Sequence, residues 1–367
     1  FKPFIYTVAL QNGFTPASTV NDAPVVFDDS KLEDIWRPEN DGGKFYGPTR
    51  IREALYRSRN LVSIRLLRRM GIDNTLQGLQ KFGFDTGDMP ADLSLSLGSH
   101  ALTPMDIARG YTIFANGGFL VQPYILDKII DRDGNIIFEA TPDTACDLCI
   151  EPRKGKGSDE FSAEQIDLEL SALLDTLAEE LIPNSEKDHY QLISQTLRNH
   201  PQPQTISAKR AMDAPTAFLI DSILKDVIKK GTGRKAKSLK RNDLAGKTGT
   251  TNGPRDAWFS GYSSHLVATA WVGFDDYSQL GRNEYGGSAA LPIWIDFMGE
   301  ALKDKPQTNL PQPTGIVSIK IDPKTGARVA PNQSGIFEFF RTENVPEAIT
   351  KGSKPASNEE PLPEDLF

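Results

Sequence analysis

The 367-residue sequence predicts an α+β fold, because segments with helical periodicity and a strand hairpin occupy different parts of the chain. Apolar residues recur at helical spacing on both sides of a long polar stretch. The clearest strand patterns, residues 257–262 and 266–274, follow one another across the short link 263–265. Two strands joined so closely are expected to pair in the antiparallel direction. A hydrophobic content of 38% is enough to bury a sizeable core.

The first helices are predicted between residues 51 and 71. Apolar residues recur with the helical period before Ser58 and again after Asn60. Ser58 and Asn60 are therefore expected at a junction between two helices. The preceding residues 12–30 contain Asn-Gly, Thr, Ser and Pro, and are predicted to be loop and extended chain.

Two further helices have clear start and stop signals. Thr103 can cap free amides and Pro104 suits the first helical position, so a helix is predicted from there to the Asn-Gly-Gly at residues 116–118. The other helix is predicted to begin at residues 213–215 and to end in the Lys-Lys-Gly at residues 229–231.

A polar segment in the middle of the chain divides the predicted domain. Residues 141–210 are interpreted as an insertion, with an amphipathic helix expected over residues 168–182 and a weaker one near residues 189–197. The predicted division is therefore 1–140 as the first part of the domain, 141–210 as the insertion, 211–305 as the sheet part, 306–345 as a C-terminal hairpin region and 346–367 as a disordered tail.

The charge and hydropathy of the chain exclude several classes of partner. A net charge of −8 and a pI near 5.2 argue against binding nucleic acid or an anionic membrane surface, which would favour a basic patch. No segment approaches the about 18 to 20 apolar residues needed to span a bilayer, and the start lacks the pattern of a signal peptide. Any membrane anchor or export signal is therefore expected outside this chain, and the chain is interpreted as a fragment of a longer protein.

Cys146 and Cys149 have the spacing of a C-x-x-C motif. This spacing occurs in redox pairs, in half of a zinc site and in local disulfides. No second half of a zinc site is present, and no histidine lies beside the pair. A small surface disulfide or two free thiols is the favoured interpretation, with metal or redox chemistry as the alternative.

The most informative motif is Lys247-Thr248-Gly249-Thr250, which precedes the predicted hairpin. On an exposed strand edge, the lysine ammonium and the two hydroxyls can hold a substrate carboxylate, while glycine leaves room for a peptide backbone. The sequence repeats Lys-Thr-Gly at residues 324–326. There, the preceding Asp-Pro and the glycine predict a turn, so this copy is interpreted as a hairpin tip.

Two further elements accompany Lys247 in a defined order. Lys2 stands near the start, Ser58 and Asn60 form a Ser-x-Asn element, and the Lys-Thr-Gly motif follows. The motifs S-x-x-K, S-D-N and K-T-G occur together in penicillin-binding proteins and class A β-lactamases. Each motif residue also has an interpretation without a catalytic role. Lys2 could be an ordinary solvated lysine, and Ser58 and Asn60 could only cap the helix that follows them.

Beyond these motifs, the sequence resembles the transpeptidase domain of class A, bifunctional penicillin-binding proteins, and is most similar to the 1a type of Gram-negative bacteria. The likeness covers roughly residues 1–130 and 212–300. It implies a penicillin-binding protein/serine β-lactamase-like fold, in which an antiparallel sheet is flanked by helices, an all-helical lobe adjoins it, and the N-terminal part is missing from this chain. The strings that carry it are at residues 1–4, 36–40, 45–48, 52–55, 96–99, 114–118, 245–251 and 256–259.

The resemblance implies a role for each motif residue. The serine nucleophile stands three residues before the motif lysine, and thus two positions before Phe1, outside the sequence. Lys2 would be the base, Ser58 would pass a proton to the departing D-alanine, and Asn60 would hold a carbonyl of the donor peptide. The terminal carboxylate of the substrate and its oxyanion would be bound by Lys247, Thr248, Gly249 and Thr250.

A second S-x-x-K pattern, at Ser222 and Lys225, is rejected as the nucleophile element. It follows the Ser-x-Asn element instead of preceding it. In the predicted helix, the buried stripe turns both residues toward the opposite face. This stripe consists of Ile220, Ile223, Leu224 and Val227.

The resemblance implies a D,D-transpeptidase that cross-links peptidoglycan stem peptides ending in D-Ala-D-Ala and that is acylated by β-lactams. It further implies an upstream glycosyltransferase domain, a single anchor in the bacterial inner membrane with the domain on the periplasmic face, and other cell-wall synthesis proteins or lipoprotein activators as partners. No metal or organic cofactor is required. The alternatives are a D,D-carboxypeptidase or β-lactamase, which transfers the acyl group to water, and a non-catalytic penicillin-binding scaffold.

Overall fold

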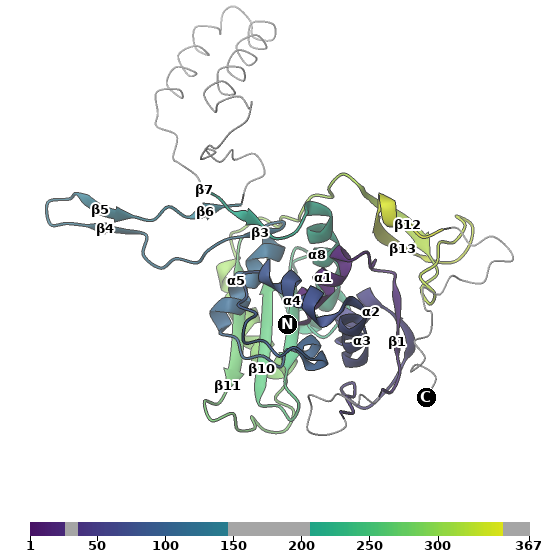
Figure 1. The fold of residues 1–367 in the computed structure, drawn as a ribbon. Helices are drawn as coiled ribbons and strands as arrows, with labels where there is room; N and C mark the ends of the chain where they lie inside the picture. Colours follow the sequence, from purple (N-terminus) through teal and green to yellow (C-terminus); the bar gives the residue numbers. More distant parts are fainter. Residues whose placement is uncertain (26–35, 146–205, 348–367) are drawn as a thin grey trace, which may run out of the picture. The chain divides into compact units, whose positions relative to one another are not determined.

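The computed structural model describes residues 1–25, 36–145 and 206–347 and divides the chain into two compact units (Figure 1). One unit comprises Phe1–Val121 together with Lys209–Phe367, and the other comprises Gln122–Ala208. All of the motif residues lie in the first unit.

A three-stranded antiparallel sheet forms the centre of the first unit, in the order β11-β10-β9. Its strands are β9 (Ala245–Thr250), β10 (Asp256–Tyr262) and β11 (Val267–Gly273). The predicted hairpin is therefore confirmed as β10 and β11. Strand β9, which carries the Lys-Thr-Gly motif, is an edge of this sheet and pairs Lys247 with Ser260.

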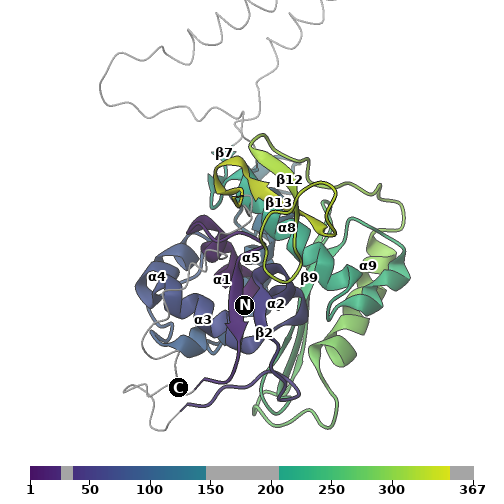
Figure 2. The same cartoon turned by 90° about the vertical axis from the view of Figure 1, so that its right-hand side faces the viewer.

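Alternating side chains of β10 pack against helices on opposite faces of the sheet, as the twofold period of a strand requires. On one face, Tyr262 donates a hydrogen bond to Asp221 and packs against Tyr111. On the other face, Phe259 lies against Trp294 with ring centroids 4.9 Å apart. Figure 2 shows the corresponding arrangement, with α9 (Leu291–Ala301) across the sheet from the other long helices.

The helices on the first face are mostly those that precede the sheet in the chain. Helix α1 is buried from Lys2 to Leu10, and Phe4 lies within a cluster of aromatic rings. This face and its lobe consist of α1 (Lys2–Gln11), α2 (Ile51–Arg57), α3 (Asn60–Met70), α4 (Ile72–Gln80), the short helix η1 (Leu93–Leu97), α5 (Pro104–Ala115) and α8 (Ala214–Lys229). The predicted α+β class is therefore confirmed.

The helix boundaries follow local signals that the sequence contains. Thr103 and Asp106 form a capping box at the start of α5, and Asp213 accepts the amide of Thr216 at the start of α8. The predicted junction between α2 and α3 is confirmed, because Ser58 has left-handed backbone dihedrals (φ 62°, ψ 40°) directly after α2. Helix α4 was not predicted, because its sequence IDNTLQGLQ includes several poor helix formers.

The last described part of the first unit is an antiparallel hairpin of β12 (Ile316–Ile321) and β13 (Ile336–Arg341). The second Lys-Thr-Gly copy lies directly after β12 in a turn, as predicted. There the carboxylate of Asp322 accepts the amides of Lys324 and Thr325, and Gly326 has φ 73°. The short helix η4 (Thr342–Asn344) follows β13.

Short strands complete the described structure. In the first unit, β1 (Thr19–Asp22) pairs with β2 (Gly47–Arg50), and β3 (Phe119–Leu120) pairs with β8 (Lys209–Arg210). The second unit has an antiparallel pair and a parallel pair of strands. They are β4 (Lys128–Ile130) with β5 (Ile136–Glu139) and β6 (Asp143–Thr144) with β7 (Ile206–Ser207).

Some sequence predictions lie outside the described residues. These are the two helices expected within residues 168–197, both cysteines, most of the C-terminal tail and the extended residues 26 and 27. Within the residues that are described, no helix combines the length and hydropathy needed to cross a membrane.

Candidate active site

Lys2 lies in the first turn of α1 and directs its ammonium group toward the junction between α2 and α3. The Nζ atom donates a 2.6 Å hydrogen bond to Oδ1 of Asn60 and a 3.0 Å bond to the carbonyl oxygen of Ser58. The Oγ atom of Ser58 lies 3.5 Å from the same ammonium. Because Lys2 is only 8% exposed, these contacts replace solvation by water.

Asn40, which lies in neither helix, hydrogen-bonds the turn that carries Ser58 and Asn60. The Oδ1 atom of Asn40 accepts the backbone amide of Asn60 at 2.8 Å, and its Nδ2 atom donates to Asp22 at 2.6 Å. The side chain of Asn60 in turn donates to the carbonyl oxygen of Glu39. Since the N-cap residue of α3 makes no side-chain capping bond, Asn40 supplies the acceptor that the start of this helix needs.

Lys247 approaches the same hydroxyl from strand β9. Its Nζ donates a 2.9 Å hydrogen bond to Oγ of Ser58 and another to the carbonyl oxygen of Thr248. The preceding residue must be small, because a Cβ on Gly246 would lie 2.8 Å from the ring of Phe259. Glycine before Lys247 therefore allows β9 to lie close to Phe259 of the neighbouring strand.

The two lysines share an environment that disfavours positive charge. Burial lowers the pKa of Lys247 from 10.5 to about 7. Burial also lowers the pKa of Lys2 well below its usual value, and the neighbouring ammonium of Lys247 adds to this effect, whereas the carboxylate of Asp22 acts in the opposite direction. A neutral amine beside a hydroxyl can accept a proton, so this pair and Ser58 can relay protons.

The remaining motif residues form the edge of β9 beyond Lys247. Thr248 shares a 2.6 Å hydroxyl contact with Thr232, which follows α8. Gly249 is half-buried, and Thr250 is exposed and accepts the amide of Gly286 through its Oγ1 atom. The Nζ atom of Lys247 lies 3.4 Å from Oγ1 of Thr248, so this edge places an ammonium beside a hydroxyl, and both are donors that can bind an anion.

The structure links Lys2 to Ser58 and Asn60, and Ser58 to Lys247, by hydrogen bonds. Ser222 and Lys225, the second S-x-x-K pattern, have other partners. Ser222 donates to the carbonyl of Leu219 and accepts from Arg52. Lys225 pairs with Asp221 of its own helix.

Two residues with a place in this site were not assigned a role from the sequence. Asn40 belongs to residues 36–40, one of the segments that carry the family resemblance. Its hydrogen bonds to Asn60 and Asp22 could not be predicted from that segment. Thr232 follows the Lys-Lys-Gly end of α8. No local pattern connects it to Thr248.

Known proteins resemble this chain over most of its length. The family model described as "Penicillin binding protein transpeptidase domain" matches residues 1–298. Penicillin-binding protein 1A of Pseudomonas aeruginosa is 47% identical over 369 residues, covering 100% of this chain and 43% of the relative, and that of Escherichia coli is 38% identical over 92% of this chain and 42% of the relative. The crystal structure of penicillin-binding protein 1A from Haemophilus influenzae superposes with a TM-score of 0.77 at 35% identity, over 95% of this chain and 48% of that one. The chain therefore spans less than half the length of the curated relatives it matches.

Proposed function

Because this chain belongs to the transpeptidase domain family of penicillin-binding proteins, we propose that it contributes the acyl-transfer site of a D,D-transpeptidase that cross-links peptidoglycan. The observation that carries the proposal is the position of Ser58. Its hydroxyl lies between two buried lysines, 2.9 Å from the Nζ of Lys247 and 3.5 Å from that of Lys2.

In this mechanism, the nucleophile is a serine of the full-length protein two positions before Phe1. Its oxygen attacks the carbonyl carbon between the two D-alanines of a stem peptide, and its proton passes to neutral Lys2. Collapse of the tetrahedral intermediate breaks the peptide bond, and Ser58 transfers the proton to the nitrogen of the departing D-alanine. An ester between the serine and the shortened peptide remains.

The substrate carboxylate is held by the edge of β9 in this proposal. Lys247 in its charged form and the hydroxyls of Thr248 and Thr250 are its partners, and Asn60 holds a carbonyl of the donor peptide through its amide group. The amide of Thr250, with that of the nucleophile, stabilises the oxyanion, and losing one such donor typically costs about 3 to 4 kcal/mol of barrier.

The acceptor distinguishes the proposed reaction from its alternatives. An amine of a neighbouring peptide completes the cross-link, whereas water would make the protein a D,D-carboxypeptidase or a β-lactamase. The family model that matches residues 1–298 describes a transpeptidase domain, which favours transpeptidation. We also place the full-length protein in class A, with a glycosyltransferase domain, an inner-membrane anchor and a periplasmic location.

The test uses the full-length protein that contains this chain and a fluorescent penicillin. We expect covalent labelling of the wild type at the serine before Phe1. Lys2→Ala and Lys247→Ala should each slow labelling by about 100-fold or more, because general acid–base catalysis typically contributes about 100- to 10,000-fold.

Lys324→Ala is the matched control, since it changes the lysine of the second Lys-Thr-Gly copy, which lies in an exposed turn. It should label at the wild-type rate. A residue other than serine two positions before Phe1, or unchanged labelling of both lysine variants, would contradict the proposal.

A further inference from the structure

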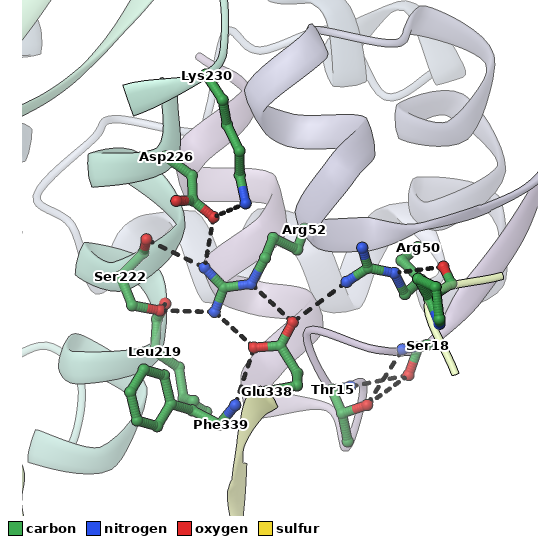
Figure 3. Close-up of polar contacts among 11 residues, drawn as sticks. Thr15, Ser18, Arg50, Arg52, Leu219, Ser222, Asp226, Lys230, Glu338 and Phe339 are labelled. Carbon is green, nitrogen blue, oxygen red and sulfur yellow. Dashed lines mark hydrogen bonds and ion pairs between the residues drawn. The ribbon is translucent and has the colours of Figure 1, made fainter. Parts of the chain in front are cut away.

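Arg52 lies in the first turn of α2 and uses all of its hydrogen-bond donors inside the protein (Figure 3). A guanidinium group has five N–H bonds. Nε and one N–H of Nη2 donate to the two carboxylate oxygens of Glu338 at 2.8 and 2.7 Å. The other N–H of Nη2 donates to Oγ of Ser222, and Nη1 donates to the carbonyl oxygen of Ser222 and to Asp226. Arg52 therefore joins α2, α8 and β13.

Glu338 is the central acceptor of this cluster. Its side chain is 2% exposed and accepts from Arg50, from both Arg52 donors and from the amide of Phe339. A buried carboxylate is costly unless it is paired and hydrogen-bonded, and two arginines meet this requirement here. Removing the charge of Glu338 would leave the buried guanidinium of Arg52 with only Asp226 as an acidic partner.

Each of the two helices joined by Arg52 leads directly to the active site. Helix α2 has only seven residues, and the residue after its end is Ser58. Helix α8 ends at Lys229, and Thr232 soon follows. The amide of Thr232 donates to the carbonyl oxygen of Tyr56 in α2, and its hydroxyl contacts Thr248 of β9.

The position of Ser58 relative to Lys247 thus depends on how α2 sits against α8. A short helix moves as a unit, so a shift at Arg52 is transmitted to Ser58. Asp226 also pairs with Lys230 at the end of α8, and Arg50 bonds the carbonyl of Pro323 in the turn after β12. These contacts fix α2 from both sides.

We propose that Glu338 is a positioning residue for acylation, acting through Arg52 and α2 on the distance between Ser58 and Lys247. Glu338 lies on the C-terminal hairpin, outside the residues 1–298 that the family model matches. This proposal rests on the proposed function. It implies that the C-terminal hairpin helps to position the acylation site.

The test measures acylation by benzylpenicillin in the full-length protein, separating the rate constant of acylation from the dissociation constant of the initial complex. Glu338→Gln keeps the shape of the side chain and removes its charge. We expect the acylation rate constant to fall by about 10- to 100-fold, since a misplacement of about 1 Å can cost about 100-fold. The dissociation constant should change little, because the edge of β9 that binds the carboxylate is intact.

The control is Phe340→Leu, two residues further along β13. Phe340 is fully buried beside Ile321 and Ala17 but does not belong to the Arg52 cluster. It should lower the unfolding temperature and leave the acylation rate constant unchanged below that temperature. An equal acylation rate in both variants would overturn the proposal and assign Glu338 a purely structural role.

A double-variant comparison gives a further readout. If Glu338 acts through Ser58, then Glu338→Gln should slow acylation much less in a Ser58→Ala background than in the wild type. Additive effects would overturn the proposal. Should Glu338→Gln fail to fold, Ser222→Ala removes one hydroxyl acceptor of Arg52 without a change of charge, and the same non-additivity with Ser58→Ala is expected. Absence of labelling in the wild type would instead refute the proposed function itself.

Discussion

The ammonium group of Lys247 donates a 2.9 Å hydrogen bond to the hydroxyl of Ser58, which joins strand β9 to the end of helix α2. Lys2 approaches the same oxygen from α1, at 3.5 Å. Because burial disfavours charge on both lysines, Ser58 can receive a proton from one amine and pass a proton to a leaving group. Its hydroxyl and its unusual backbone conformation can be tested separately.

Ser58→Ala and Ser58→Gly remove the same hydroxyl but differ in backbone cost. Ser58 has φ 62°, a conformation that glycine adopts freely and that costs other residues about 1 kcal/mol. We expect both variants to be acylated by penicillin about 100- to 10,000-fold more slowly than the wild type. Denaturant unfolding should show the glycine variant to be more stable than the alanine variant by about 1 kcal/mol.

A large difference between the acylation rates of these two variants would contradict the role of the hydroxyl. The backbone, and not the proton relay, would then be the important property of this position.

Asn40 should matter for both stability and acylation. Asn40→Ala leaves the amide of Asn60 and the carboxylate of Asp22 without a partner that they have in the structure. A buried group that loses its partner costs about 1 to 3 kcal/mol, so the free energy of unfolding should fall by that amount. The acylation rate should also fall, because the Ser58 to Asn60 turn is no longer held.

The matched control for this change is Asn74→Ala, which removes an exposed asparagine from α4. It should alter the free energy of unfolding by less than about 0.5 kcal/mol. If Asn40→Ala is as mild as this control, then Asn40 does not hold the turn.

Gly246 should tolerate no side chain, although it lies in an ordinary strand. A Cβ there would meet Phe259, the carbonyl oxygen of Ser260 and Gly261 at 2.8 to 2.9 Å. Overpacking of this kind costs about 1 to 3 kcal/mol, and it should also displace Lys247 and slow acylation. Gly287→Ala is the control, because its Cβ would meet its nearest neighbour, the carbonyl oxygen of Thr232, at 3.5 Å. Equal unfolding temperatures for the two alanine variants would refute this packing argument.

The sequence was most informative where a local rule decides the structure. The helix start capped by Thr103, the strand hairpin and the turn at residues 324–326 each follow from neighbouring residues, and each was predicted correctly. The rejection of Ser222 followed from the order of the motifs and from the helical period. What the period could not reveal was its partner, since Arg52 lies 170 residues earlier in the chain.

For the candidate active site, the identity of the residues could be predicted from the sequence, but their geometry could not. The motif order and the family resemblance singled out Lys2, Ser58 and Lys247, but their distances depend on long-range packing. Asn40, Thr232 and Glu338 were not found, because each acts on a residue that is distant in sequence. A single polar residue in a loop or on a hairpin carries no periodic signal that would connect it to such a partner.

The burial of Lys247 should make the stability of the domain depend on pH. Its pKa in the folded protein is about 7, against an ordinary value of 10.5. Between these values the unfolded chain binds more protons than the folded one, so the free energy of unfolding rises with pH from about 7 upward. Below about pH 7 Lys247 is charged in both states, and the folded state then carries the full free-energy cost of a buried ammonium group. For such a shift this cost is about 5 kcal/mol, because each pKa unit is worth about 1.4 kcal/mol.

Lys247→Met removes the charge and keeps most of the side-chain volume. We expect it to raise the free energy of unfolding relative to the wild type at about pH 6 and to lose this advantage toward about pH 10, where the wild-type lysine is neutral in both states. Denaturant titrations at both pH values measure the difference, and Lys324→Met in the exposed turn is the control without such a pH trend. An advantage of Lys247→Met that is equal at the two pH values would show that Lys247 stays charged in the folded protein, and a neutral form available for proton transfer would then have to be sought at Lys2 alone.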